Sequence, residues 1–216
     1  MTRDLLADLP PIAETERLAD GAAVLRAFAV ADAAALLAAL AVIAAASPFR
    51  RMVTPGGHTM SVAMTNCGDG GWVTDRRGYR YQPDDPETGQ PWPALPGLFL
   101  DLAGRAAAAA GFAGFRPDAC LINRYEPGTR LALHQDRNER DFGQPIVSVS
   151  LGLPAIFLFG GSSRSDRPRR VPVSHCDVVV WGGPSRLAFH GVAPLAEGDH
   201  PSTGRLRFNL TLRKAL

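Results

Sequence analysis

Residues 145–161 read PIVSVSLGLPAIFLFGG and hold two short apolar runs on either side of Pro154. These runs, residues 146–153 and 155–159, have the length and the β-branched and aromatic content of strands. Similar runs, rich in Val, Leu, Ile and Phe and separated by turn residues, cover residues 119–125, 129–135, 176–181, 187–192 and 205–213. Many short strands at this spacing predict a sandwich or jelly roll after residue 117.

The residues before 117 predict helices and turns as well as strands. Residues 32–46, DAAALLAALAVIAAA, favour a helix capped by Asp32 and ended by Ser47-Pro48, because a residue before proline avoids helical torsions. A second helix is expected from about residue 96 to 110, closed by Gly111.

Between these helices, residues 48–93 are rich in glycine, proline and aromatic residues, which predicts short strands joined by turns. Residues 161–170, GSSRSDRPRR, predict a polar basic loop. We therefore expect an α+β, mainly β fold in one compact domain, with an N-terminal part (1–93) and a β core (94–216).

Composition sets the broad class. The chain has 216 residues, 46% of them apolar, which suits one domain with a substantial core, and its net charge of +2 does not indicate a nucleic-acid partner. Cys67, Cys120 and Cys176 form no CxxC pair and predict reduced, buried thiols. The N-terminal MTRDLLADLPP lacks a targeting pattern, and the apolar stretch from Ala31 to Ala46 is too short to span a bilayer. We expect a soluble cytoplasmic protein.

A metal site is predicted where two of the expected strands end. His134 and Asp136 close the run LALHQD, and side chains at i and i+2 of a strand point to one face. His190 closes another run, RLAFHG. Two histidines and one carboxylate leave the other positions of an octahedral metal open, which suits Fe(II) with a co-substrate and O2. An HxD pair alone is a weak signal, and a structural zinc would want a fourth ligand that is not obvious here.

The last expected strand, RLRFNLTLR, alternates cleanly. Leu206, Phe208, Leu210 and Leu212 share its apolar side, while Arg207, Asn209, Thr211 and Arg213 share its polar side. A polar side usually means a surface edge strand. Near His190, however, two arginine forks in one row could bind the two carboxylates of a dicarboxylic acid.

Other polar positions follow the same alternation. Asn123 and Tyr125 share one face of CLINRYEPG and could donate hydrogen bonds to the same co-substrate. Ser148 and Ser150 place small side chains on one face of IVSVSLG, which would leave room for a ligand.

Taken together, these segments resemble the AlkB family of Fe(II)/2-oxoglutarate-dependent alkylated-DNA repair dioxygenases. The likeness runs from about residue 20 to 213 and rests on MVTPGGHTMSVAMTNCG, PDACLINRYEPG, LHQD, PIVSVSLGLPAIFLFGG, DVVVWGGPSRLAFHG and RFNLTLR. It implies a double-stranded β-helix (jelly roll) core and an N-terminal lid that recognises nucleotides.

The resemblance also implies residue roles. It implies Fe(II) bound by the catalytic residues His134, Asp136 and His190. It implies 2-oxoglutarate held by Asn123, Tyr125, Arg207 and Arg213, with Asn209 adjacent. For the damaged base it points to Trp72, Tyr79, Tyr81 and Arg164, with Met64 and Ser148 as pocket walls, and Trp72 and the His134 ring on either side of the base.

The activity implied is oxidative demethylation of bases such as 1-methyladenine and 3-methylcytosine in single- or double-stranded DNA, or in RNA. It consumes O2 and 2-oxoglutarate and releases formaldehyde, succinate and CO2. The base must first be flipped out of the helix, which costs less when methylation has already disrupted its pairing. A monomer is adequate for this work.

Two positions depart from the family pattern. Asn138 stands where an acid is expected two residues after the metal aspartate, so it can accept a hydrogen bond from an exocyclic amine but brings no charge to a cationic base. His58 replaces a more usual aromatic residue.

Charge adds modest support for a nucleic-acid partner. Arg76, Arg77 and Arg80 cluster in the expected lid, among Trp72, Tyr79 and Tyr81. Arg164, Arg167, Arg169 and Arg170 cluster in the basic loop. Solvated loops often carry such clusters, but interleaved aromatic residues favour contact with phosphates and bases.

Two alternatives stay open. A 2-oxoglutarate oxygenase acting on a small molecule or a protein side chain would keep the iron and the arginines, yet would have no use for residues 72–81. A jelly-roll binding module would not turn over 2-oxoglutarate at all.

Overall fold

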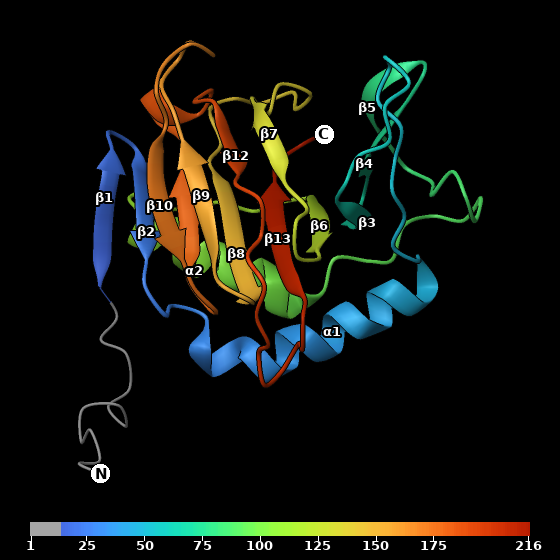
Figure 1. Cartoon of the computed structure of the whole chain (residues 1–216), viewed down its shortest axis with the longest axis horizontal. Helices are drawn as coiled ribbons and strands as arrows, with labels where there is room; N and C mark the ends of the chain where they lie inside the picture. Colours follow the sequence, from blue (N-terminus) through green and yellow to red (C-terminus); the bar gives the residue numbers. More distant parts are fainter. Residues whose placement is uncertain (1–13) are drawn as a thin grey trace.

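The computed structural model describes residues 14–216, so the N-terminal stretch MTRDLLADLPP considered above lies outside the described residues. Within them, two antiparallel sheets face each other (Figure 1). The larger sheet has the order β1-β2-β11-β8-β13-β6-β3. Its strands are β1 (Thr15–Ala19), β2 (Ala22–Leu25), β3 (Ala63–Gly68), β6 (Ala119–Tyr125), β8 (Ile146–Gly152), β11 (Val178–Trp181) and β13 (Arg207–Arg213).

The smaller sheet has the order β10-β9-β12-β7. Its strands are β7 (Leu131–His134), β9 (Ala155–Phe159), β10 (Arg169–Val173) and β12 (His190–Val192). A separate hairpin, β4 (Gly71–Asp75) with β5 (Gly78–Gln82), stands beside the sandwich (Figure 1). The mainly β fold with a jelly-roll core is confirmed, and so are the short strands expected between residues 48 and 93.

Two helices, α1 (Ala33–Ala46) and α2 (Gly97–Ala109), cover the outer face of the larger sheet (Figure 1). Leu36, Leu40 and Ile43 of α1 share one buried cluster with Phe99 and Leu102 of α2 and with the apolar side chains of β6, β8, β11 and β13. Short 3-10 turns occupy Val30–Asp32 (η1) and Gly183–Ser185 (η2). No helix in the described part of the chain has the length and apolar character needed to cross a membrane.

Strand β13 lies in the middle of the larger sheet, between β8 and β6, and not at an edge. All seven of its residues are buried. Phe208, Leu210 and Leu212 pack toward the helices, as the alternation predicts. The polar row that includes Arg207 and Arg213 faces the interior of the sandwich, where it lines a cavity.

Local details differ from the expectations in three places. Asp32 stands at the start of α1, but its side chain makes no capping hydrogen bond; it forms an ion pair with Arg105 of α2 instead, at 2.7 Å. Strand β10 includes Arg169 and Arg170, which were expected in a loop, because these residues pair with Phe159 and Leu158 of β9. Strands β7, β8, β11, β12 and β13 are shorter than the runs expected for them.

The three cysteines are free and buried, as predicted. Cys67 of β3 and Cys120 of β6 lie opposite each other in the strand register. Gly111, with φ +92°, follows α2 in the left-handed region that favours glycine and so closes the helix as expected.

The contrast between the two faces of α1 predicts a difference in stability. Leu36 is completely buried in the helix–sheet cluster, whereas Val42 of the same helix is 71% exposed. Leu36→Ala should lower the free energy of unfolding by about 2–5 kcal/mol, because it leaves a cavity. Val42→Ala should change it by less than about 0.5 kcal/mol. Urea unfolding followed by circular dichroism measures both, and equal losses would contradict this account of the core.

Candidate active site

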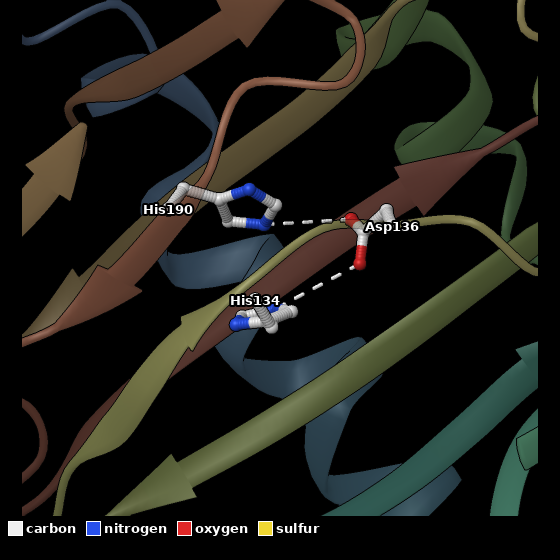
Figure 2. A group of neighbouring side chains, drawn as sticks. All are labelled: His134, Asp136 and His190. Carbon is white, nitrogen blue, oxygen red and sulfur yellow. Dashed lines mark ion pairs between the residues drawn. The ribbon is translucent and has the colours of Figure 1, made fainter. Parts of the chain in front are cut away.

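Three side chains lie close together at one end of strands β7 and β12 of the smaller sheet. His134 ends β7 and His190 begins β12, and the two residues are direct partners in the antiparallel register. Asp136 follows two residues after His134. The carboxylate lies 3.7 Å from His134 Nε2 and 3.6 Å from His190 Nε2 (Figure 2). One ligand atom from each residue fits within a group whose members are all within 4.8 Å of one another.

Hydrogen bonds orient both imidazoles for metal binding. The Nδ1 atoms of His134 and His190 lie 2.8 and 3.0 Å from the carbonyl oxygens of Ala132 and Ala188. A ring that donates through Nδ1–H keeps its lone pair on Nε2, which points to the centre of the group. Burial, helped by the neighbouring His190, lowers the pKa of His134 to about 4, so the ring is neutral at pH 7. The set fits a facial Fe(II) site.

Arg213 holds the third ligand in place. Its Nη2 and Nε lie 2.7 and 3.0 Å from Asp136 Oδ2. Burial alone would lower the pKa of Arg213, but the charge of Asp136, followed by Tyr81 and Glu139, outweighs burial and raises it. The pKa of Asp136 is held well below its usual range, against burial, by Arg213 and then by His190. The carboxylate is therefore ionised and ready to bind a cation.

Glu139 and Arg186 belong to this assembly although the sequence gave no reason to select them. Arg186 is buried and donates from Nη1 to the backbone oxygen of Asp136 at 3.0 Å and from Nη2 to Glu139 at 3.3 Å. Glu139 also accepts from the hydroxyl of Tyr81 at 2.7 Å. An arginine inside the apolar stretch before His190 was the available signal; Glu139 reads like any surface acid.

The co-substrate residues lie on two neighbouring strands. In the register of β13 with β6, Arg207 faces Tyr125 and Asn209 faces Asn123. Asn209 Nδ2 donates to Ser148 Oγ at 2.7 Å, and Asn209 Oδ1 accepts from Asn123 Nδ2 at 3.4 Å. Asn209 therefore orients Asn123 as well as lining the cavity.

Arg207 is a buried cation without an anionic partner among the described residues. It is 2% exposed, its guanidinium lies 4.9 Å from the centre of the Tyr125 ring, and its Nη2 donates to Ser150. Its Nε and Nη1 have no hydrogen-bond partner in the structure, nor do Tyr125 Oη and Asn123 Oδ1. Burial lowers the pKa of Arg207. Buried polar groups normally have partners, so the donors of this set, the Arg207 guanidinium and the Tyr125 hydroxyl, fit a carboxylate-bearing co-substrate such as 2-oxoglutarate.

A cavity of about 960 Å³ joins the metal ligands to the co-substrate residues. Six of the residues predicted for the damaged base also line it: Met64, Trp72, Tyr79, Asn138, Ser148 and Arg164. Tyr81 is placed behind the cavity wall, where its hydroxyl accepts from Arg213 Nη1 at 3.3 Å and donates to Glu139. His58 lines the outer part of the same cavity.

The hairpin arginines are less available than the sequence suggested. Arg77 and Arg80 both form ion pairs with Asp75, at 2.8 and 2.9 Å. In the second cluster Arg169 pairs with Glu16 at 2.5 Å, whereas Arg164 lines the cavity. The contact with phosphates therefore stays a prediction, and among the described residues Arg76, Arg164, Arg167 and Arg170 are the members of the two clusters without an ion pair.

The family comparison agrees with this geometry. A family model described as the 2OG-Fe(II) oxygenase superfamily matches residues 21–213. The fold and the site thus define a 2-oxoglutarate- and Fe(II)-dependent oxygenase.

Individual relatives narrow the class. The α-ketoglutarate-dependent dioxygenase AlkB of Escherichia coli (strain K12) is 58% identical over 212 residues, which are 98% of this chain and 97% of the relative. The AlkB homolog of Caulobacter vibrioides (strain NA1000 / CB15N) is 46% identical over 172 residues, 78% and 76% of the two chains. A solved structure described as that of OsALKBH1 superposes with a TM-score of 0.82 at 27% identity, over 93% of this chain and 100% of the other.

The chain belongs to the AlkB family. The predictions of an Fe(II)- and 2-oxoglutarate-dependent dealkylating dioxygenase, and of both cofactors, are confirmed.

The two guanidinium nitrogens of Arg207 without a partner predict that this residue binds a carboxylate of the co-substrate. Arg207→Ala should raise the apparent KM for 2-oxoglutarate by about 100-fold, near 3 kcal/mol, because a desolvated carboxylate loses its charged partner. Arg207→Lys should restore only part of the loss, since an ammonium cannot form the two-pronged contact. Succinate formation against 2-oxoglutarate concentration gives these values. Arg205→Ala, which removes an exposed ion pair with Glu197, is the control and should leave the curve unchanged. An unchanged curve for Arg207→Ala would place the dicarboxylate elsewhere.

Proposed function

We propose that this enzyme reverses alkylation damage by oxidative removal of N-methyl groups from bases such as 1-methyladenine and 3-methylcytosine in DNA, single- or double-stranded, and in RNA. One observation carries the proposal: a single cavity is lined by the three metal ligands, by Arg207, which has no acidic partner among the described residues, and by Trp72 of the hairpin. The relatives described as AlkB, and those described as a nucleic acid dioxygenase and a tRNA demethylase, support a nucleic-acid substrate.

The co-substrate is held, in this proposal, by groups that the fold leaves free. Arg207 pairs with one carboxylate, and the unpartnered hydroxyl of Tyr125 donates to its oxygens. Asn123 Nδ2 gives one hydrogen to Asn209 Oδ1 and has a second one to donate to the co-substrate. Arg213, already paired with Asp136, lies toward the metal and supports the other end. Asn209 keeps Asn123 in position.

The base is held between rings. Trp72 lines the cavity from the hairpin side and His134 from the sheet side, so a flipped base enters between them, with Met64 and Ser148 as walls. Flipping costs a few kcal/mol, and stacking on an aromatic face returns roughly 1–3 kcal/mol. Tyr79, Tyr81 and Arg164 complete the contacts, with Tyr81 acting through Glu139.

His134, Asp136 and His190 would hold Fe(II), which together with O2 and 2-oxoglutarate would supply the oxidation of the N-methyl carbon that ends in release of formaldehyde, succinate and CO2. The protein's own task is to place the methyl group and to keep the carboxylate of Asp136 ionised. Arg213 keeps the carboxylate ionised through its ion pair, and Arg186 holds the backbone of Asp136 in place through its carbonyl oxygen.

The two parts of the chain supply different groups of the site. Residues before 94 supply Met64, Trp72, Tyr79 and Tyr81 for the base, and residues 94–216 supply the metal and co-substrate groups. Since one chain supplies every group named here, we infer that the enzyme works as a monomer. Three buried free thiols fit the reducing conditions of a cytoplasm.

The activity test is direct. Oligonucleotides that carry 1-methyladenine or 3-methylcytosine, incubated with protein, Fe(II) and 2-oxoglutarate in air, should lose the methyl group, as measured by mass spectrometry. His134→Ala, Asp136→Ala and His190→Ala should each abolish turnover while the circular dichroism spectrum is retained, because each removes one metal ligand. Wild-type activity in any of them would remove that residue from the site.

The hairpin separates this proposal from an oxygenase that acts on a small molecule or a protein side chain. Trp72→Ala should weaken binding of methylated single strands by roughly 1–3 kcal/mol, the usual value of one base–aromatic stack. Iron binding should stay intact, because Trp72 lies in a different segment from the ligands. Titration with quenching of tryptophan fluorescence in the wild type, and anisotropy of a labelled strand for the variant, measures the effect. Equal affinity of both proteins would favour the rival substrate class.

A further inference from the structure

We propose that Asn66 of β3 is a positioning residue for the damaged base, because its side-chain amide fixes the backbone of Trp72 and thereby the place of the stacking ring in the cavity. The inference rests on the proposed function, in which the base stacks on Trp72. It adds a residue that lies outside the cavity lining and acts on the base only through Trp72.

The hairpin that carries Trp72 needs an anchor outside its own two strands. Among the described strands, β4 and β5 pair only with each other, and a two-stranded hairpin by itself is marginally stable in water. The segment that joins this hairpin to β3 reads GDGG over residues 68–71, and Gly68 has a φ of +118°. Glycines leave the backbone many conformations, so the covalent connection does not by itself fix the position of Trp72.

The side-chain amide of Asn66 takes the place of a partner strand at Trp72. The backbone nitrogen of Trp72 donates to Asn66 Oδ1 at 3.0 Å, and its backbone oxygen accepts from Asn66 Nδ2 at 3.0 Å. An antiparallel ladder joins two residues by the same pair of N–H···O bonds. Both backbone groups of Trp72 are thus turned toward β3 and away from Tyr81, which is its partner on β5.

Asn66 offers a rigid support for this contact. The residue is 1% exposed and lies on β3, all six residues of which pair with β6. In the same register Met64 of β3 lies opposite Asn123, so the strand pair that holds Trp72 also carries a residue of the co-substrate site. One side chain therefore ties the place of the stacking ring to the place of the co-substrate.

The other contacts of Trp72 orient its ring and leave its backbone free. The indole stacks with Tyr79, with ring centres 5.6 Å apart, and its Nε1 donates to Asn138 Oδ1 at 3.1 Å. Tyr79 belongs to the same hairpin, so this stack moves with Trp72 and cannot anchor it. Among the described residues, Asn66 is the only one whose side chain hydrogen-bonds to the backbone of Trp72.

The experiment removes both hydrogen bonds with Asn66→Ala. The dissociation constant for a single strand with 1-methyladenine, measured by anisotropy with Fe(II) and 2-oxoglutarate but without O2, should rise by about tenfold. The apparent KM for 2-oxoglutarate should change by less than about twofold, because the contacts of Arg207 are retained. Thr65→Ala is the matched control, since it removes a buried hydrogen bond to Ser47 from the next residue of β3. It should lower the Tm and leave the dissociation constant unchanged.

Two further measurements separate positioning from a loss of stability. When Trp72→Ala is already present, adding Asn66→Ala should change the dissociation constant by less than about twofold, because the ring that Asn66 positions is gone. Hydrogen exchange of a peptide that covers residues 68–75, followed by mass spectrometry, needs no nucleic acid. The backbone N–H of Trp72 should exchange about tenfold faster or more in Asn66→Ala, and at the wild-type rate in Thr65→Ala.

Asn66→Ser serves if Asn66→Ala does not fold; its single hydroxyl cannot span both backbone groups, so the same changes should follow by a smaller factor. Wild-type affinity and exchange in the variant used would overturn the inference. A loss of affinity that is equally large with and without Trp72 would also overturn it, because Asn66 would then act through the general stability of the chain. If Trp72→Ala alone binds the methylated strand as tightly as the wild type, the proposed function fails and this inference fails with it.

Discussion

The ion pair between Arg213 and Asp136 joins the two halves of the active site. Asp136 lies just beyond the smaller sheet, and Arg213 ends the central strand of the larger sheet. Their contact at 2.7 Å keeps a metal ligand ionised inside the protein and ties the loop after β7 to β13. A buried pair of this kind is costly to break from either side, because the remaining charge is left without a partner. This contact therefore links the two sheets at the metal site.

The two arginines of β13 look equivalent in the sequence but differ in the structure. Arg213 is neutralised by Asp136 and lies near Glu139, with its Nε 3.5 Å from that carboxylate. Arg207 has no acidic partner within residues 14–216, and its guanidinium lies over the ring of Tyr125. Of these two arginines, Arg207 is therefore the one whose charge is free to bind an anion in the cavity. Arg213 contributes shape and orientation, since its charge is already balanced.

The alternation of side chains along the strands predicted much of the fold and of the site. The alternation of RFNLTLR separated a core face from a cavity face, and the i, i+2 spacing of His134 and Asp136 placed both on one side. Periodicity could not predict which side chains from distant segments contact each other. Asp32 met Arg105 instead of capping its helix, and β1 and β2 are too short to show a period. Glu139 and Arg186 became part of the site only through contacts between distant segments.

Burial of the thiols matters in an enzyme that uses O2, because it limits their oxidation. Burial raises the pKa of Cys120 well above its usual value, and burial with the nearby charges of Asp177 and Asp32 raises the pKa of Cys176 to about 11. Oxidants attack thiolates much faster than thiols, so these sulfurs resist oxidation as long as the chain is folded. Their modification by a thiol reagent then requires the sheet and helix layers to separate. The rate of that modification therefore measures how often the core opens.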